Sequence, residues 1–313
     1  MDQFFQQLVN GLTLGSLYAL IAVGYTVVYG IVQLINFAHG EVFMIGAFGA
    51  LTTYLFFFDG QTGVWILPIM IIGAIIASVG TAVLMERVAY RPLRNAPRLA
   101  PLITAIGISV FLQEFVRLFY ERIPDFPSAK QRIPFPQLDL VSGPAKEIAG
   151  VTIQRSAIFT VAALVICAAL LWYFINRTRL GRGMLAVSQD PDTARLMGIN
   201  VDRIIVVAFA LGAALAAIAG VSQGLQNNNI DFRMGFLAGL KAFTAAVLGG
   251  IGNIQGAVLG GLVLGVVEAM ATQYIPGQFG GSTWKDVWAF VILILVLVFR
   301  PQGLLGARVV DRA

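Results

Sequence analysis

Polar side chains gather at two interruptions of apolar stretches in the sequence. The first interruption carries Asn36, His39, Gly40 and Glu41, and the second spans residues 248–256. Ionisable groups within apolar segments are costly and usually functional, so these side chains could line or gate a solute pathway. Glu41 could instead be an interfacial cap of the helix that follows, because a carboxylate complements the positive end of a helix dipole. The sequence leaves both interpretations open.

The second interruption is rich in glycine. Breaks in a spanning helix are tolerated only where protein or a water-filled cavity covers the freed backbone, and matched breaks in two halves of a chain indicate a transport pathway. Gln113 and Glu114 of another apolar segment could belong to the same pathway, although Glu114 could simply pair with Arg117. The predicted pathway set is Asn36, His39, Gly40, Glu41, Gln113, Glu114, Gly250, Gly252, Asn253, Gln255 and Gly256.

Residue types needed for other chemistry are missing from the sequence. No lysine follows a glycine, which excludes the G-x-x-x-x-G-K-[ST] loop that binds nucleotide phosphates. One cysteine and one histidine cannot form a metal cluster, and His39 with Glu41 is the only candidate for a reactive pair. The apolar segments also lack the row of carboxylates expected of a proton relay. We therefore predict no enzyme and no cofactor, and pumping would need energy from another chain.

The composition predicts an integral membrane protein, whose surface faces lipid. Hydrophobic residues make up 58% of its 313 residues, charged residues 12%, and the mean hydropathy is +0.82, whereas soluble domains are nearer half apolar and a quarter charged. The net charge of +5 comes from arginines in a few loops, which report membrane topology and do not indicate nucleic-acid binding. A single membrane domain, residues 1–313, accounts for the whole length.

A spanning helix needs about 20 mostly apolar residues, and the sequence offers nine candidate stretches. We predict an all-α, polytopic bundle of eight to ten transmembrane helices with broken or half-helices. The seventh stretch is short enough to be a half-helix, and the first is long enough to contain a break. The stretches are 8–34, 41–58, 64–85, 99–120, 156–175, 204–225, 237–251, 254–275 and 286–299.

Arginine-rich loops predict the orientation of the bundle. Residues 86–98, residues 176–203 and the tail from Arg300 onward carry most of the arginines, and the positive-inside rule places all three in the cytoplasm. The number of segments between them is even, so this assignment is self-consistent. Residues 121–155 then face outward as an irregular loop or a short β-hairpin, and the N-terminus lies outside by alternation.

Small residues recur at four-residue spacing on two predicted helix faces, which allows close packing in lipid or sliding of helices during gating. Glu268 stands alone in an apolar helix and is predicted to face the bundle interior with a partner that the sequence does not name. Lys241 and Lys285 are predicted to reach water from outer helix ends. The small residues are Ala208, Gly212, Ala216, Gly220 and Gly224, then Gly252, Gly256 and Gly260.

The cytoplasmic loop at 176–203 is predicted to hold a short amphipathic helix. Ser188 or Asp190 can cap it, and Pro191 fits its first turn. Such a helix suits either a groove on a partner protein or the membrane surface. Its apolar face would consist of Ala194, Leu196 and Met197, and Gly198 would end it.

Six runs of the sequence carry a resemblance to a known family. They are NGLTLGSLYALIA at 10–22, INFAHGE at 35–41, ERVAYRP at 86–92, LMGIN at 196–200, GLKAFTAA at 239–246 and FRPQGLLG at 299–306. Together they resemble the LivH-type permeases of high-affinity branched-chain amino acid ABC importers, over nearly the full length.

The resemblance implies a multi-pass protein of the bacterial cytoplasmic (inner) membrane that moves branched-chain or related hydrophobic amino acids inward by alternating access. It implies as partners a second homologous permease subunit, two cytosolic ATPase subunits that bind the ATP, and a periplasmic substrate-binding protein. Family members also include permeases for urea and short amides. A stand-alone channel or secondary carrier is the remaining alternative.

Importer permeases of this kind engage their ATPase through an E-A-A-x-x-x-G type element. Residues 192–198 look like a degenerate version, in which Asp192 stands for the Glu and Thr193 for the first Ala. By this resemblance we expect the ATPases to pull the loop at 182–199. The predicted coupling set is Arg182, Asp190, Asp192, Thr193, Ala194, Leu196, Met197, Gly198 and Ile199.

Overall fold

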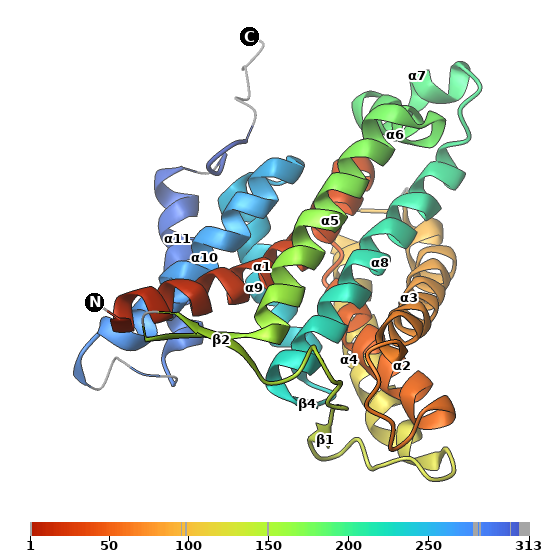
Figure 1. The fold of residues 1–313 in the computed structure, drawn as a ribbon. Helices are drawn as coiled ribbons and strands as arrows, with labels where there is room; N and C mark the ends of the chain where they lie inside the picture. The colour runs from red at the N-terminus through yellow and green to blue at the C-terminus, as the bar shows by residue number, and fades with distance from the viewer. Residues whose placement is uncertain are drawn as a thin grey trace.

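A computed structural model of the protein describes residues 2–94, 96–97, 99–148, 150–277, 281, 283–300 and 302–306. The chain forms a helical bundle (Figure 1). Nine helices of the described residues correspond to the nine predicted stretches, which confirms the predicted helix count. They are α1 (Asp2–Val32), α2 (His39–Phe57), α3 (Ile66–Met85), α4 (Leu99–Phe119), α5 (Arg155–Arg177), α8 (Val201–Asn227), α9 (Met234–Gly249), α10 (Ile254–Tyr274) and α11 (Lys285–Phe299).

Seven of these helices are long and apolar enough to cross a membrane, judged by length and composition of the described residues: α1, α2, α3, α4, α5, α8 and α10. The shorter α9 has 16 residues, as expected of a half-helix, and α11 has 15. Short helices and turns fill the connections. They are the π-helix η1 (Glu86–Tyr90), the 3-10 turns η2 (Arg91–Leu93) and η3 (Tyr120–Arg122), α6 (Arg179–Gln189) and α7 (Pro191–Leu196).

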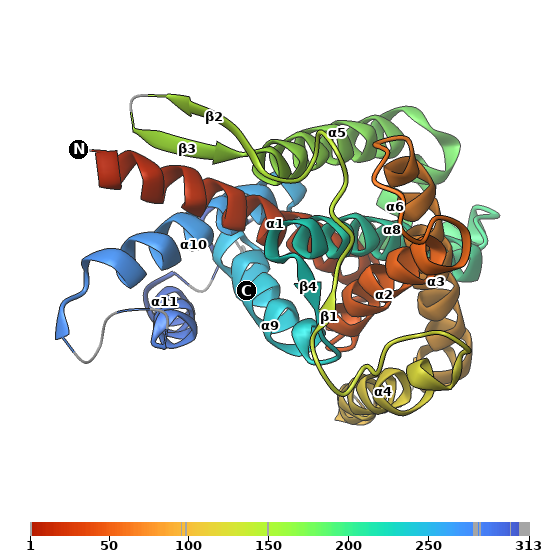
Figure 2. The ribbon, with the colours of Figure 1, turned by 60° about the horizontal axis from the view of Figure 1, so that its bottom comes forward.

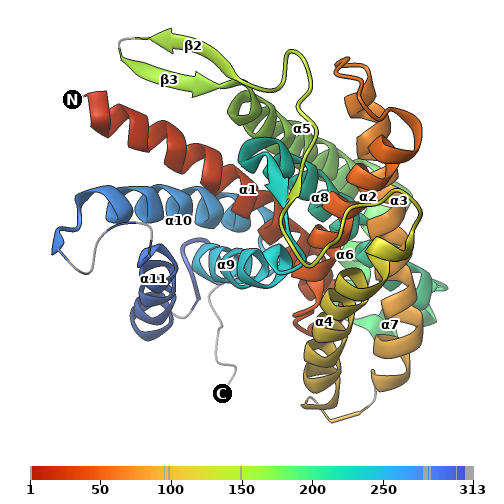
Figure 3. The ribbon, with the colours of Figure 1, turned by 90° about the horizontal axis from the view of Figure 1, so that it is seen from below.

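The helix α1 lies at the centre of the bundle, with α5 and α10 on opposite sides (Figures 2 and 3). Every residue from Gly15 to Val28 is buried. The break that the length of this segment suggested is absent, and α1 runs without interruption over 31 residues. An uninterrupted helix pairs its backbone groups within itself and needs no outside partner at membrane depth.

Glycines bring α1 and α10 into contact through their backbones. A Cβ atom on Gly15 would lie 2.8 Å from the carbonyl oxygen of Gly261, and one on Gly11 would lie 2.7 Å from the Cα of Val266. In lipid the hydrophobic effect does not drive helix association, and close backbone packing of this kind holds the helices together. The α1–α10 contact therefore depends on the absence of side chains at these positions.

The predicted small-residue face of α8 packs in the same way. A Cβ atom on Gly212 would lie 3.0 Å from the carbonyl oxygen of Gly24, and one on Gly220 would lie 2.9 Å from the backbone nitrogen of Ala47. The second predicted face is only partly correct, because Gly252 precedes α10 and a Cβ atom there meets open space.

Short strands cover the end of the bundle opposite α6 and α7 (Figure 1). The strands β2 (Pro144–Ile148) and β3 (Val151–Gln154) form an antiparallel hairpin, which confirms the hairpin predicted within residues 121–155. The strands β1 (Ile133–Pro134) and β4 (Asn229–Ile230) also pair.

The N-terminal end of α1 lies beside this hairpin. Gln6 Nε2 donates to the carbonyl oxygen of Thr152 at 3.2 Å, and the Thr152 nitrogen donates to Gln6 Oε1 at 2.8 Å. The N-terminus is therefore at the end opposite the arginine-rich loop of α6 and α7, as alternation predicted. Arg98 and the tail beyond Gly306 lie outside the described residues.

Candidate functional site

The first predicted break lies deep in the bundle. Residues 33–38, between α1 and α2, are not helical. Asn36, His39 and Glu41 are 3%, 2% and 0% exposed. The His39 ring lies against Gly212, near the middle of α8. Protein therefore covers the end of the break that adjoins α2, at Asn36 and Ala38, whereas Gln33 at its other end is exposed. Cover by protein is the condition under which irregular backbone is tolerated at membrane depth.

Asn36 ties this break to the end of α3. Its Oδ1 accepts a hydrogen bond from the Tyr90 hydroxyl at 2.7 Å and another from the backbone nitrogen of Ala38 at 3.1 Å. Tyr90 closes the π-helix η1 that continues α3. Single π-helical turns are uncommon and are frequent at functional sites. The sequence contained the ERVAYRP run but no signal that Tyr90 would reach Asn36.

Glu41 and Gln113 are brought together as the pathway prediction requires. Glu41 Oε1 accepts hydrogen bonds from Gln113 Nε2 at 2.8 Å and from Ser109 Oγ at 2.9 Å, both on α4. Its other oxygen, Oε2, has no partner among the described residues and lies beside Gly235 of α9. Glu41 is in the first turn of α2, where its charge can complement the helix dipole as the alternative interpretation expected, but it is completely buried and not at an exposed interface.

His39 and Glu41 point to different neighbours. The Glu41 carboxylate faces α4, whereas the His39 ring packs on Tyr25 of α1 with 4.7 Å between ring centroids. The His39 Nε2 atom has no hydrogen-bond partner in the described part of the chain. The two side chains thus belong to one buried polar region without contacting each other.

Glu114 is not part of this region. Its Oε2 pairs with a guanidinium nitrogen of Arg117 at 2.5 Å, and the two side chains are 44% and 38% exposed. This is the local pair that the sequence offered as the alternative. A role of Glu114 in the pathway stays an untested prediction.

The second predicted break joins α9 to α10. Gly250 and Gly252 adopt φ angles of 106° and 95°, which glycine tolerates readily. Asn253 caps α10, because its Oδ1 accepts from the Gly256 nitrogen at 3.2 Å. The two breaks are neighbours, since Ile35 of the first and Ile251 of the second line the same void of about 10 Å³.

The second break differs from the first in exposure. Gly252 and Gln255 are exposed, whereas the polar residues of the first break are buried. The C-terminal segment packs on the second break, because the Leu304 nitrogen donates to the Leu248 carbonyl at 2.8 Å and Asn253 Nδ2 donates to the Leu305 carbonyl at 2.9 Å. The sequence therefore located both breaks but not their different surroundings.

The coupling prediction falls on α7. Asp190 caps it, since its Oδ1 accepts from the backbone nitrogens of Asp192 and Thr193 at 2.9 and 3.0 Å, while the Thr193 hydroxyl bonds Oδ2 at 2.5 Å. The hydrogen bonds from Thr193 hold the pKa of Asp190 below its ordinary value. Ser188 bonds the Leu185 carbonyl instead and is not the cap.

The predicted apolar face of α7 is split between two sides. Leu196 and Met197 are 87% and 78% exposed, whereas Ala194 is buried at 4%. The backbone turns at Gly198, where φ is 83°, and the chain enters α8. The prediction of one face formed by all three apolar residues is therefore wrong, because six residues make too short a helix to present a continuous stripe.

Ion pairs connect the start of α8 to the loop after α3. Asp202 pairs with Arg91 at 2.6 Å and with Arg94 at 2.5 Å, and Arg94 also bonds the carboxylate of Glu86. Glu86 is 0% exposed and opens the π-helix that ends at Tyr90. Ion pairs therefore lead from Asp202 at the start of α8 to Glu86, the π-helix η1 joins Glu86 to Tyr90, and Tyr90 bonds Asn36 of the first break.

A buried ion-pair cluster between α1, α9, α10 and α11 was missed by the sequence reasoning. Lys241 Nζ lies 2.7 Å from Glu268 Oε1 and 2.5 Å from Asp286 Oδ1, and the Tyr18 hydroxyl donates to Glu268 Oε2 at 3.0 Å. Lys241 is 4% exposed, so its predicted position at an aqueous helix end is wrong. Glu268 faces the interior as predicted. A lone acid and a lone base in separate apolar segments were the available signal.

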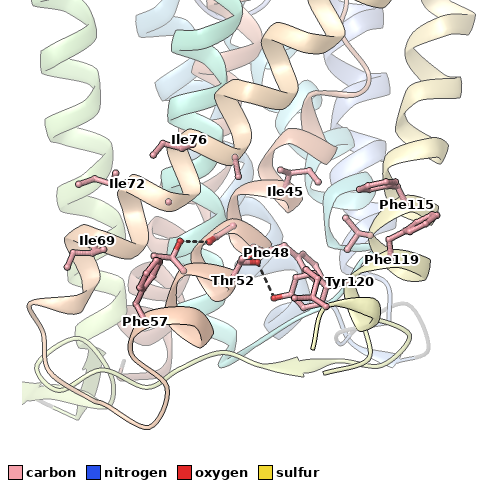
Figure 4. A pocket seen from close by; sticks show the side chains of 16 residues that line it. Ile45, Phe48, Thr52, Phe57, Ile69, Ile72, Ile76, Phe115, Phe119 and Tyr120 are labelled. Carbon is pink, nitrogen blue, oxygen red and sulfur yellow. Dashed lines mark hydrogen bonds between the residues drawn. The ribbon is translucent and has the colours of Figure 1, made fainter. Parts of the chain in front are cut away.

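A large apolar groove lies between α2, α3 and α4 (Figure 4). Its volume is about 740 Å³, and its lining includes Ile72, Phe115 and Phe119. The Thr52 and Tyr120 hydroxyls meet at its outer end, 3.4 Å apart. None of the predicted pathway residues lines this groove, so it is separate from the buried polar region around Glu41.

Comparison with known proteins places this architecture in a family. The family model described as the permease component of the branched-chain amino acid transport system matches residues 7–297. The high-affinity branched-chain amino acid transport system permease protein BraD of Pseudomonas aeruginosa is 47% identical, over 99% of this chain and 98% of the relative.

Two further relatives are also described as branched-chain amino acid permeases. The high-affinity branched-chain amino acid transport system permease protein LivH of Escherichia coli K12 is 44% identical over 99% of this chain and 97% of its own length. A probable branched-chain amino acid transport permease protein LivH of Methanocaldococcus jannaschii is 29% identical over 93% and 89%. This chain belongs to the permease component family of branched-chain amino acid transport systems.

Proposed function

We propose that this chain is the permease subunit of an ABC importer that moves branched-chain amino acids into the cytoplasm. The observation that carries the proposal is the match to branched-chain amino acid permeases over nearly the full length of both chains. The spanning helices agree with a multi-pass protein of the inner membrane. The absence of a nucleotide-binding sequence agrees with a subunit that ATPase partners drive.

An importer permease of this kind works with ATPase and substrate-binding partners. We propose the composition that the sequence resemblance implies: two homologous permease subunits, two cytosolic ATPases and one periplasmic binding protein. The strand-covered end, with β1 to β4, would receive the binding protein, and the end with α6 and α7 would receive the ATPases.

The α7 tip is our proposed contact with the ATPase. Leu196 and Met197 place two large apolar side chains in solvent on a six-residue helix. Two adjacent large apolar side chains at the end of a projecting helix offer an apolar contact for a partner. The Asp190 cap holds the first turn of α7 together, and the buried Ala194 packs the helix on the bundle, so a pull on the tip would be transmitted to α8.

The contacts from Asp202 through Arg94 and Glu86 to Tyr90 and Asn36 are our proposed route from this tip to the pathway. Movement of α8 would shift the arginines that hold Asp202, and the Tyr90–Asn36 hydrogen bond lies at the end of that chain. The polar region around Glu41 and Gln113, next to the first break, is the proposed gate. The neighbouring glycines of the second break would complete it.

Reconstitution tests the proposal. The chain is expressed with the permease, ATPase and binding-protein genes that neighbour it. The complex is placed in proteoliposomes, with ATP on the side of the membrane that carries the ATPases and the binding protein with its amino acid on the other side. We expect ATP-dependent uptake of leucine, isoleucine and valine and none of urea. Uptake of urea alone would assign the complex to the amide transporters, and flux without ATPase subunits would identify a channel or secondary carrier.

A further inference from the structure

Three arginines converge on one cavity next to the coupling helix. The cavity has a volume of about 590 Å³ and is formed by α6, the Gly198 turn and the first turn of α8. Arg179, Arg182 and Arg203 line it together with apolar side chains such as Leu180 and Ile204. A site of this kind combines strong positive charge with an apolar wall.

No carboxylate of the surrounding segment neutralises these arginines. The segment from 176 to 203 contains three acids. Asp190 caps α7, Asp192 pairs with Arg195 at 3.1 Å, and Asp202 is held by two arginines of the loop after α3. Within the described ranges, no ion pair involves any of the three cavity arginines. Their charge is therefore available to an external anion.

The position of the cavity indicates where that anion comes from. Arg179 lies two residues beyond Arg177, the last residue of the spanning helix α5, and Arg203 is in the first turn of the spanning helix α8. Both arginines therefore lie at the level where two helices leave the membrane. The exposed Leu196 and Met197 are the last residue and the C-cap of α7, and α7 lies farther from the strand-covered end of the bundle than α5 (Figure 1).

Phospholipid headgroups occupy this level of a bilayer. A phosphodiester carries one negative charge and presents oxygens that match the donors of a guanidinium fork. Basic pockets between helices on the cytoplasmic side of membrane proteins bind anionic headgroups for this reason. The apolar wall of Leu180 and Ile204 suits the first carbons of the acyl chains.

We propose that this cavity binds the phosphate of an anionic phospholipid of the cytoplasmic leaflet. The bound lipid links α6 to the start of α8 by attracting arginines of both. It thereby fixes the height of the coupling helix above the membrane surface. The site adjoins the proposed ATPase contact and shares Arg182, Gly198 and Ile199 with the predicted coupling set, whereas Leu196 and Met197 do not line it. None of its lining residues belongs to the buried polar region around Glu41.

Native mass spectrometry of the full-length chain, released from detergent micelles, tests the proposal. The chain is titrated with phosphatidylglycerol and, separately, with phosphatidylcholine of the same acyl composition. We expect one phosphatidylglycerol to be retained in preference to phosphatidylcholine. Each of the substitutions Arg179→Gln, Arg182→Gln and Arg203→Gln should weaken it about fivefold, and the triple variant on the order of a hundredfold, since each arginine contributes roughly equally.

The matched control is Arg195→Gln, which removes an exposed arginine of α7 that already has a carboxylate partner. It should leave the lipid affinity unchanged. Competition with inorganic phosphate separates a lipid site from a free-phosphate site: displacement of the lipid at millimolar phosphate would overturn the lipid assignment. The proposal is also overturned if the triple variant retains phosphatidylglycerol as the parent chain does. A triple variant that no longer co-purifies with the ATPase but keeps its lipid affinity would assign the three arginines to the ATPase contact.

Discussion

Removal of the Lys241 ammonium tests how the buried charges of the bundle are balanced. In the Lys241→Met variant, Glu268 loses its ion-pair partner at 2.7 Å and keeps only the hydrogen bond from Tyr18. The Glu268 side chain is 2% exposed and cannot regain water, whereas Asp286 is 33% exposed and stays hydrated. An unpaired buried charge costs about 3–5 kcal/mol. We expect the free energy of unfolding to fall by that amount.

The double variant Lys241→Met with Glu268→Gln should recover most of this loss, because no charge is then left unpaired in the interior. Stability is measured by titrating SDS into the protein in a mild detergent and following the loss of helical circular dichroism. The control is Lys130→Met, which breaks an exposed pair with Glu121 and should cost at most about 1 kcal/mol. A double variant no more stable than Lys241→Met would refute the charge-balance argument.

Three further outcomes follow from the geometry. The double variant Leu196→Asp with Met197→Asp should abolish ATPase co-purification without changing the midpoint of unfolding, and retained co-purification of this variant would refute the tip contact. Ala194→Glu should instead lower the midpoint of unfolding, because Ala194 is buried. Tyr90→Phe deletes the hydrogen bond to Asn36, which is worth about 1 kcal/mol, and should leave ATPase activity intact while uptake falls; parallel loss of both would contradict the proposed route. The pKa of Asp190 is lowered from 3.8, so the ionised side chain caps α7 at any pH above 3.8 and the cap is lost only as the pH falls through the lowered pKa. ATPase co-purification should therefore stay constant between pH 8 and 5, and a decline in that range would contradict the role of the cap.

The bundle was predictable from the sequence because each spanning helix must be apolar over its full length. That constraint made the nine helical stretches visible in the sequence. Their alternation placed the hairpin and the arginine-rich loops at opposite ends, and the spacing of small residues identified the packing face of α8. The two breaks were also visible, since glycine and polar residues stand out in an apolar run. Their position next to each other was not, because it depends on how α1, α2, α9 and α10 pack.

Side-chain partners across helices were beyond the sequence pattern. Lys241 and Glu268 each looked like an isolated charge, and only the packing of α9 on α10 reveals that they neutralise each other. Glu41 was predicted as a pathway residue, and the structure shows it buried against α4, but its donors there could not be assigned from spacing alone. The split between Ala194 and Leu196 was missed because a helix of six residues is too short for periodicity to identify its buried side.

The glycine contacts between α1 and α10 restrict how this permease can move. Gly11 and Gly15 of α1 meet the backbone of α10 at distances that leave no room for a methyl group. Sliding one helix along the other would press side chains into the space that these glycines leave open. The two helices therefore travel as one rigid body, and spin labels placed on them should report one constant separation throughout the ATP cycle while distances to α2 change.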